Sequence, residues 1–554
     1  METSGQTYTL DVFVGDQLRP LFEEERLWER RDLVDDLRGF LRGRGPYVCV
    51  LYGLRRTGKS TAMLQVLSEM DEDELRRSAF VQLTPGASMR ELANDLRRLR
   101  SVGVRNVFVD EVTLADDFID GAAFLSDVMA RSGMRIVLSG TDSLSFWLAS
   151  CSTLYDRCVV IHSTHIPFAE HARLLGTNDV DDYIRFGGTL SIGGLRAASD
   201  TFADGHSTWR YVDSAIAHNI QHSLACYRDG GTFRSLYPLY ERGELTNTIN
   251  RVVEATNHEF CVRTLRRRFK SRDLGSLMQL MRNGTGVRRG IDIDDPPFDA
   301  EGVTRRLKDA LNILEADELA EMPTSERLGE VRHWLQTLEA VAPYEVRTLD
   351  EGARTFVRDV ITQPGLRFSQ AQELVHSLMT DAFVQSLPAA YQEIMASALA
   401  EDVMGRMLEE IVLHETQTAL ADTHDVFKLA GHGPVPGHSG MFEYEIDKVV
   451  RDSASNTCAL YEVKHTERRD ERQGRWLRDE RVVSEAERRF GRIASRAVLY
   501  CGESARNPFG DGIDYANVSE YLLSVRANRP KPRQRRRGVG LSLMGFGNPE
   551  QDIR

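Results

Sequence analysis

One short segment constrains the fold of this chain more than any other feature. The pattern G-x-x-x-x-G-K-[ST] is matched by Gly53-Leu54-Arg55-Arg56-Thr57-Gly58-Lys59-Ser60. An apolar run, Tyr47 to Tyr52, precedes the segment and is typical of a buried strand. A strand, a glycine-rich turn and a helix N-terminus together bind phosphate through backbone N–H groups. The sequence therefore predicts a nucleotide-binding loop, and a turn without chemical function is the alternative.

The residue types in this loop suit the binding of phosphate and Mg²⁺. Gly53 and Gly58 let the backbone wrap around phosphate oxygens without a Cβ in the way. Lys59 is expected to reach the β- and γ-phosphates, and Ser60 to bind Mg²⁺. We therefore expect ATP and Mg²⁺ as cofactors. The residues expected to bind them are Gly53, Arg56, Thr57, Gly58, Lys59, Ser60, Thr61 and Asp110.

A second apolar run, Val107-Phe108-Val109, ends in two acidic residues. Asp110 is expected to complete the Mg²⁺ coordination, and Glu111 to act as the general base for the attacking water. The alternative is that the two acids only begin a loop. Their distance from Lys59 leaves room for a helix, a strand and a second helix, which favours the functional interpretation. Glu111 directly after Asp110 also favours hydrolysis over the transfer reaction of a kinase.

Polar residues follow another predicted strand, Arg135–Leu138, at Ser139-Gly140-Thr141-Asp142-Ser143. Such residues lie in the crevice where parallel sheets bind ligands, so Thr141 could contact the γ-phosphate. Helix capping is the equal alternative, because Ser, Thr and Asp are favoured N-caps. Arg157 is a candidate arginine finger, which would imply a homo-oligomer, and a surface salt bridge is the alternative.

The order of apolar runs and helical patterns predicts an α/β multidomain protein. We expect an N-terminal parallel sheet flanked by helices, a mainly helical middle, and a small C-terminal α/β domain. The middle should contain few strands, a loop is expected at 431–440, and residues 17–45 should be a helical lead-in. The expected division is a lead-in at 1–28, the nucleotide-binding domain at 29–176, a helical lid or winged-helix region at 177–282, a helical connector at 283–399, the α/β domain at 400–525, and a basic, disordered tail at 526–554.

Carboxylates recur near the end of the chain in two strand-like segments. Strand side chains alternate, so Glu462 and Lys464 share a face, and Asp447 lies beside Glu462 if the two strands pair. Glu409, on a predicted helix upstream, could add a third carboxylate. Such a group could hold Mg²⁺ and orient a hydrolytic water. The alternative is a binding domain in which Asp447 and Lys464 form an ion pair.

The motifs resemble those of the prokaryotic AAA-like ATPases that carry a C-terminal domain of the restriction-endonuclease type. The resemblance covers roughly residues 20–190 and 400–505. Its segments are Tyr52–Ser60, Val107–Glu111, Ser139–Ser143, Asp156-Arg157, Ile166–Glu170, Tyr183–Gly188, Gly405–Val412, Glu445–Asp447 and Glu462–Lys464. The chain departs from the family at Thr141, where serine is usual, at Asp156, where glycine is usual, and in the shortened run Pro167–Glu170. The role of Arg157 is therefore the weakest inference from the family.

The resemblance implies an ATPase coupled to a nuclease-like module that acts on nucleic acid, in the handling of foreign DNA or mobile elements. It implies catalytic roles for Asp447, Glu462 and Lys464, with Glu409, Asp447 and Glu462 as metal ligands. A nucleotide-switched DNA- or protein-binding regulator with an inactive nuclease-like domain is the alternative. Basic residues at 263–272 and 526–537 are candidate contacts to DNA. The alternatives are a solvated face or pairing with the acidic surface of the protein for the first stretch, and a solubilising tail for the second.

The composition excludes several other classes of protein. The formal net charge of −13 argues against a protein that coats nucleic acid by bulk charge. No run approaches the roughly 18 apolar residues of a membrane span, and the polar N-terminus predicts no secretory signal. The seven cysteines form no CxxC pair, which indicates reduced thiols in the cytoplasm. His162, His165 and His171 lack a supporting cysteine, so we expect them to be structural.

Overall fold

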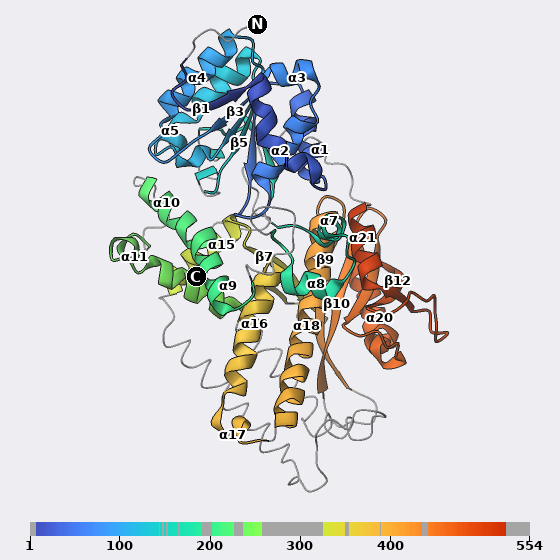
Figure 1. The fold of residues 1–554 in the computed structure, drawn as a ribbon. Helices are drawn as coiled ribbons and strands as arrows, with labels where there is room; N and C mark the ends of the chain where they lie inside the picture. Colours follow the sequence, from blue (N-terminus) through green and yellow to red (C-terminus); the bar gives the residue numbers. More distant parts are fainter. Residues whose placement is uncertain are drawn as a thin grey trace, which may run out of the picture.

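The structure is a computed structural model of the 554-residue chain (Figure 1). It describes residues 7–142, 145–146, 149–150, 153–163, 165–190, 202–226, 236–257, 325–349, 354–387, 389–434 and 441–527. The basic stretch at 263–272 and the tail beyond residue 527 lie outside the described residues. Within the described residues, no helix is both long enough and apolar enough to cross a bilayer.

The N-terminal unit is built on a six-stranded sheet with the order β1-β3-β4-β5-β2-β6. Its strands are β1 (Asp11–Val14), β2 (Val48–Tyr52), β3 (Ser78–Gln82), β4 (Asn106–Asp110), β5 (Arg135–Ser139) and β6 (Cys158–His162). All neighbours are parallel except β1, which pairs antiparallel with β3. The predicted parallel sheet is confirmed. Strand β1 was not predicted, because four residues at a sheet edge leave little pattern in the sequence.

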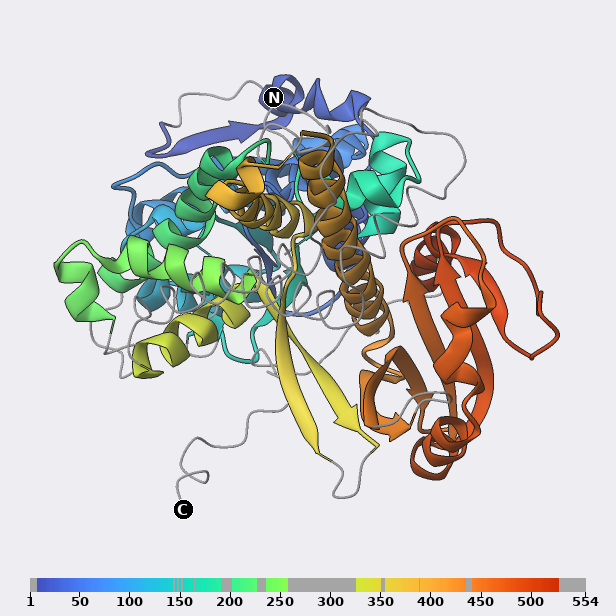
Figure 2. The same cartoon turned by 90° about the horizontal axis from the view of Figure 1, so that it is seen from below.

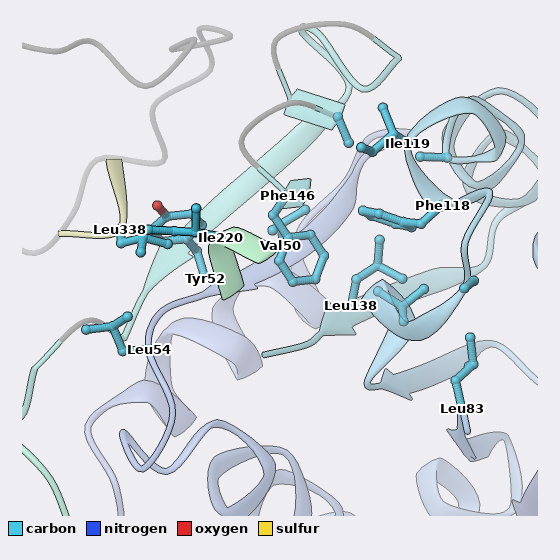
Figure 3. Packing of buried hydrophobic residues seen from close by; sticks show 14 of the residues in the cluster. Val50, Tyr52, Leu54, Leu83, Phe118, Ile119, Leu138, Phe146, Ile220 and Leu338 are labelled. Atoms are coloured by element: carbon cyan, nitrogen blue, oxygen red, sulfur yellow. The ribbon is translucent and has the colours of Figure 1, made fainter. Parts of the chain in front are cut away.

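Helices cover both faces of this sheet, which explains why its strands are continuous apolar runs. The helical segments are η1 (Gly15–Phe22), η2 (Glu25–Leu27), α1 (Leu33–Arg42), α2 (Lys59–Ser68), α3 (Glu72–Arg76), α4 (Met89–Ser101), η3 (Val112–Leu114), α5 (Phe118–Gly121), η4 (Leu125–Met129) and η5 (Ala130–Ser132). On one face, Leu51 packs with α1 and α2. On the other, Val50 and Leu138 pack with Phe118 and Phe146 (Figure 3). The expected helical lead-in at 17–45 is correct only in part, because η1 and η2 are short 3₁₀ turns.

The middle of the chain contains helices and one hairpin. The helical segments are α7 (Phe168–Leu175), α8 (Val180–Phe186), α9 (Gly205–Val212), η7 (Asp213–Ala217), α10 (His218–Cys226), α11 (Tyr237–Glu241), α15 (Ser325–Thr337), α16 (Pro364–Met379), α17 (Ala382–Gln385) and α18 (Ala389–Leu420). The hairpin consists of β7 (Val341–Thr348) and β8 (Thr355–Ile361), shown in yellow in Figure 2. The middle was expected to be mainly helical with few strands, and this hairpin is a strand pair that the expected helical connector at 283–399 did not include.

The C-terminal unit is built on a seven-stranded sheet with the order β13-β12-β11-β10-β9-β7-β8. Its further elements are β9 (Asp425–Pro434), β10 (Met441–Asp452), β11 (Thr457–Lys464), η8 (Glu471–Gly474), α19 (Arg475–Arg478), α20 (Glu480–Phe490), β12 (Arg492–Tyr500), β13 (Asp514–Asn517) and α21 (Val518–Ala527). The predicted pairing of β10 with β11 is confirmed, and it is antiparallel. The loop expected at 431–440 is wrong at its start, because β9 continues to Pro434.

In the described residues, helices cover both faces of this second sheet. Residues of α18 and α21 pack with Val463 and Leu499 on one face, whereas α19 and α20 pack with Leu460 and Val498 on the other. The order of elements is therefore a long helix, three antiparallel strands, a helix and two parallel strands, with the β7–β8 hairpin added next to β9.

Candidate functional site

The predicted phosphate loop connects β2 to α2, and its two glycines are required by close neighbours. Gly58 is the N-cap of α2 with φ +70°. A Cβ at Gly58 would lie 1.8 Å from Nη1 of Arg31, and one at Gly53 would lie 1.9 Å from the carbonyl oxygen of Ser163. Any side chain at either position would displace a buried neighbour. The loop therefore has the conformation that the motif predicts, and the packing of Arg31 and Ser163 against its two glycines fixes it.

Lys59 folds back onto its own loop. Its Nζ donates hydrogen bonds to the carbonyl oxygens of Gly53 at 2.8 Å and Leu54 at 2.7 Å. Burial lowers the pKa of Lys59 to about 8, against the opposite effect of Glu111 and Asp110. A phosphate would satisfy this buried ammonium better than two neutral carbonyls, because charge-assisted hydrogen bonds are the stronger ones.

The two predicted Mg²⁺ ligands of this site are in direct contact. The hydroxyl of Ser60, at the start of α2, donates to Oδ2 of Asp110, at the end of β4, at 2.8 Å. Asp110 is buried, and Thr61 follows Ser60 in the first turn of α2. A carboxylate and a hydroxyl at this separation are the protein oxygens that Mg²⁺ uses beside nucleotide phosphates. The residues present therefore fit the expected cation.

Glu111 is held by Thr141 from the neighbouring strand end. Both the backbone N–H and the hydroxyl of Thr141 donate to Oε2 of Glu111, each at 3.1 Å. Glu111 has φ +54°, a strained region for a residue other than glycine. Burial, with a contribution from Asp110, raises the pKa of Glu111. Glu111 and Thr141 thus meet at the carboxyl end of the sheet, as predicted.

The candidate arginine finger, Arg157, forms a surface ion pair. Its Nη1 is 3.0 Å from Oδ2 of Asp127, and the Arg157 side chain is 44% exposed. The surface salt bridge was the alternative interpretation of this residue, and the structure contains it. Within this chain, Arg157 is not brought to Lys59 or Glu111.

An ion pair that the sequence analysis missed supports the loop. Arg31 and Glu170 are 1% and 3% exposed, and Nε of Arg31 donates to Oε1 of Glu170 at 2.7 Å. Nη1 of Arg31 also donates to the carbonyl oxygen of Thr57 at 2.8 Å. Glu170 belongs to a motif that carried the family resemblance, but nothing in the sequence distinguished Arg31 from the other arginines.

The C-terminal carboxylates converge because β10 contains a bulge. Ile446 pairs with Leu429 and Val449 with Phe427, so Asp447 and Lys448 together oppose a single residue of β9. The regular pairing of β10 with β11 begins only at Lys448. Beyond Lys448, a side chain replaces the backbone as the acceptor: Oδ2 of Asp447 accepts a hydrogen bond from the backbone N–H of Val463 at 2.8 Å.

All four predicted residues of this cluster lie together. Nζ of Lys464 is 2.6 Å from Oε2 of Glu462 and 3.2 Å from Oδ2 of Asp447. Carboxylate oxygens of Glu409, Glu445 and Asp447 lie within 4.8 Å of one another. Glu445 was missed as a candidate ligand, although strand alternation placed it on the face of Asp447.

Two further cations enter the cluster. Arg406 contacts the carboxylates of Glu409 and Glu445, the second at 2.9 Å, and Nζ of Lys428 is 3.3 Å from Oε2 of Glu409. With Lys464, three cations face four carboxylates. Neither Arg406 nor Lys428 was predicted, because the contacts of Arg406 with Glu445 and of Lys428 with Glu409 join different elements and appear only in the folded chain.

The acids of the cluster have different pKa values. Burial raises the pKa of Asp447, but Lys464, Lys428 and Arg406 outweigh it and hold the pKa at about 2. Burial raises the pKa of Glu409 to about 7 despite Arg406. Burial also raises the pKa of Glu462 well above its ordinary value. Among the described residues, no group donates a hydrogen bond to Oε1 of Glu462, which is buried. This free oxygen and the adjacent carboxylates fit an oxygen-ligated divalent cation.

The three histidines do not form a metal site. Nδ1 of His162 is 2.7 Å from Oε1 of Glu339, whereas the His171 ring packs edge-on against Tyr183. His165 lies 3.8 Å from Glu415. In the described part of the chain, Glu409, Glu445 and Asp447 are the only group of three or more His, Cys, Asp or Glu side chains close enough to share an ion.

Comparisons with known proteins bear on the part of the chain that contains the phosphate loop. The profile of the AAA domain matches residues 46–172. A search of curated proteins gave no match. Among solved structures, S. cerevisiae Hsp104 in its extended complex with casein is 14% identical, with a TM-score of 0.25, over 48% of this chain and 50% of that chain. This chain therefore spans about half the length of Hsp104.

Two other solved structures are similarly distant. The Aeropyrum pernix ORC1 protein in complex with DNA is 18% identical, with a TM-score of 0.21, over 66% of this chain and 94% of that chain. The S. cerevisiae Hsp104–ADP complex is 12% identical, with a TM-score of 0.24, over 73% of this chain and 58% of that chain. Scores this low carry no argument about the whole chain. The range that matches the AAA domain profile, residues 46–172, contains the phosphate loop and the Asp110–Glu111 pair.

Proposed function

We propose that the chain is a Mg²⁺-dependent ATPase coupled to a C-terminal nuclease-like module that acts on nucleic acid, most plainly DNA. The observation that carries the first part is the contact between Ser60 and Asp110, with Glu111 next to it and Lys59 at the loop. These groups come from the end of β4 and the N-terminus of α2, at the edge of a parallel sheet where phosphates bind. A Mg²⁺ ion bound there would neutralise charge on the phosphates.

The residues of the AAA domain divide the work of hydrolysis. Lys59 exchanges its two carbonyl partners for phosphate oxygens. Glu111 accepts a proton from the attacking water, for which its raised pKa brings it closer to neutral pH. In the present conformation its Oε2 is bonded to Thr141, so this contact must loosen before Glu111 can serve as the base.

The nuclease-like assignment is supported by the convergence of Asp447, Glu462 and Lys464 on paired strands, with Glu409 from the preceding helix. A cation held by the carboxylates would polarise a phosphate oxygen. Lys464 would orient the hydrolytic water and stabilise charge that develops on the phosphate. A role in handling foreign DNA or mobile elements is the part of this proposal that rests on family resemblance alone.

A second candidate function has its own observation. Arg406 and Lys428 already neutralise Glu409 and Glu445, so the cluster is charge-paired without any added ion. A cluster of this kind suits a nucleotide-switched regulator that binds DNA or protein without cutting it. The C-terminal sheet would then be a binding platform, and Asp447 and Lys464 would form a structural ion pair.

Cleavage of DNA by the full chain separates the two functions. We expect Mg²⁺-dependent cleavage by the natural protein and its loss in Asp447→Asn, which removes the charge but keeps the shape. Glu480→Gln is the matched control, because Glu480 is an exposed acid in α20 of the same unit. Cleavage that persists in Asp447→Asn would show that the proposed site is wrong. No cleavage of DNA or RNA with ATP, with ADP or without nucleotide would favour the regulator.

We place the protein in the cytoplasm. Among the described residues, Cys49, Cys458 and Cys501 form no disulfide, as expected in a reducing compartment.

A further inference from the structure

The two helices that follow the first sheet touch both candidate sites. We propose that α7 and α8, residues 168–186, transmit the nucleotide state of the phosphate loop to the carboxylate cluster. This inference rests on the proposed nucleotide binding, and it names the structural route by which that binding regulates the second site. The route has three attachments, one to the phosphate loop, one to α18 and one to the end of β11.

The first attachment joins the phosphate loop to α7. The Arg31 guanidinium donates at once to the carbonyl oxygen of Thr57, in the loop, and to the carboxylate of Glu170, in α7. Glu170 also accepts a hydrogen bond from the backbone N–H of Asp32 at 2.8 Å. Because Arg31 and Glu170 are almost fully buried, neither can exchange its partner for water. A shift of the loop at Thr57 is therefore passed to α7.

Nucleotide binding supplies such a shift. In the structure, Lys59 donates to the carbonyl oxygens of Gly53 and Leu54 and so closes the loop on itself. A phosphate would draw Lys59 away and release both carbonyls. The carbonyl oxygen of Thr57, in the same loop, accepts hydrogen bonds from the hydroxyl of Ser163 at 2.9 Å and from the Arg31 guanidinium. A rearrangement of the loop would therefore displace both of these side chains. The ligand thus has different contacts with the two loop states, which is what a population shift requires.

The second attachment joins both helices to α18. Oε1 of Glu415 accepts from the backbone N–H of Phe168, at the start of α7, at 3.0 Å. It also accepts from the hydroxyl of Tyr183, in α8, at 2.9 Å. Glu415 is buried and lies six residues after Glu409 on the continuous helix α18. A helix moves as a rigid element over this length, so a displacement at Glu415 also displaces Glu409.

The third attachment joins α8 to the lysine of the cluster. Oδ1 of Asp181, in the first turn of α8, is 2.7 Å from Nε2 of His465. His465 directly follows Lys464 at the end of β11. The elements that carry Glu409 and Lys464 therefore both contact the same pair of helices, α7 and α8. The relative position of Glu409 and Lys464 decides whether the carboxylate cluster is assembled, so a movement of these helices would affect the cluster.

Hydrogen exchange of the full chain tests this route without relying on nuclease activity. Exchange is measured with and without a non-hydrolysable ATP analogue and Mg²⁺, and binding of the analogue is measured separately by calorimetry. Coupling free energies between sites commonly correspond to 5- to 150-fold effects. We expect the analogue to change exchange at least about fivefold at residues 461–467 and 406–416 in the natural protein.

Two variants and one control complete the test. Asp181→Asn should remove the response at 461–467 and keep the response at 406–416, whereas Glu415→Gln should do the reverse. Asp182→Asn, an exposed neighbour in the same turn, should respond like the natural protein. Because Asp181 is 40% exposed, its variant can be made without disturbing the core even if Glu415→Gln does not fold.

Three outcomes would overturn the inference. Analogue binding without any change at either segment would overturn the route but leave the ATPase proposal standing. A response in Asp181→Asn equal to that of the natural protein at 461–467 would show that the third attachment transmits nothing. Absence of analogue binding would overturn both the inference and the proposed nucleotide binding.

Discussion

Replacement of Glu170 by glutamine should destabilise the N-terminal unit by about 3 kcal/mol. Removing one partner of a buried ion pair costs roughly 3–5 kcal/mol, because the other charge stays buried without compensation. Arg31 would be that charge, since it is 1% exposed. Glutamine keeps an acceptor for Asp32, so we expect the lower end of this range. About 3 kcal/mol corresponds to a roughly 150-fold change in the unfolding equilibrium.

The measurement is urea denaturation of the full chain, with hydrogen exchange used to identify the transition that includes α2 and α7. Asp73→Asn is the matched control, because Asp73 and Arg76 form an ion pair whose side chains are 79% and 64% exposed. Exposed pairs of this kind contribute little. If Glu170→Gln were as mild as Asp73→Asn, the reasoning that the Arg31–Glu170 pair supports the loop would be refuted.

The pH dependence of this difference has a definite sign. Burial raises the pKa of Glu170, but Arg31 outweighs it, so the pKa in the folded protein lies below the ordinary value of 4.5. An acid with a lowered pKa contributes stability above its unfolded pKa and loses it as the pH falls through the folded pKa. The natural protein and Glu170→Gln should therefore converge in stability below about pH 4.5.

Two further predictions concern the candidate ligand sites. Because burial lowers the pKa of Lys59 to about 8 and phosphate needs the protonated form, nucleotide affinity should fall by up to about tenfold per pH unit above pH 8. Calorimetry that shows constant affinity from about pH 7 to pH 9.5 would contradict this. Arg406→Gln should strengthen Mn²⁺ binding at the carboxylate cluster roughly tenfold, because it removes the cation that pairs with Glu409 and Glu445. Electron paramagnetic resonance in an Asp110→Asn background isolates this site, and unchanged affinity would show that Arg406 does not compete with the metal.

The phosphate loop could be predicted because its chemistry requires particular residue types at consecutive positions. Gly53, Gly58, Lys59 and Ser60 are adjacent in the chain, so the motif and the site are the same segment. Arg31 supports the same loop but lies 139 positions from Glu170, and only the folded chain brings them together. A single arginine in a helical pattern is indistinguishable from a solvent-exposed one.

The carboxylate cluster could also be predicted from the sequence only in part. Strand alternation was enough to place Glu462 with Lys464, and the pairing of β10 with β11 placed Asp447 near them. The bulge that turns both Asp447 and Lys448 to one side of β10 depends on pairing with β9, which no local pattern shows. The β7–β8 hairpin was missed for a related reason. It joins a sheet whose next strand, β9, begins more than 60 residues later, and β7 contains a proline and charged residues.

Comparison of ATP binding and ATP hydrolysis in Glu111→Gln tests the central claim most directly. Glutamine keeps the size of Glu111 and an acceptor for Thr141, but it cannot take a proton from water. The account predicts that the variant binds ATP with the affinity of the natural protein and that its turnover falls by roughly 100-fold or more. Hydrolysis by Glu111→Gln at the natural rate, or equal loss of binding and turnover, would contradict the assignment of Glu111 as the base of a Mg²⁺-dependent ATPase.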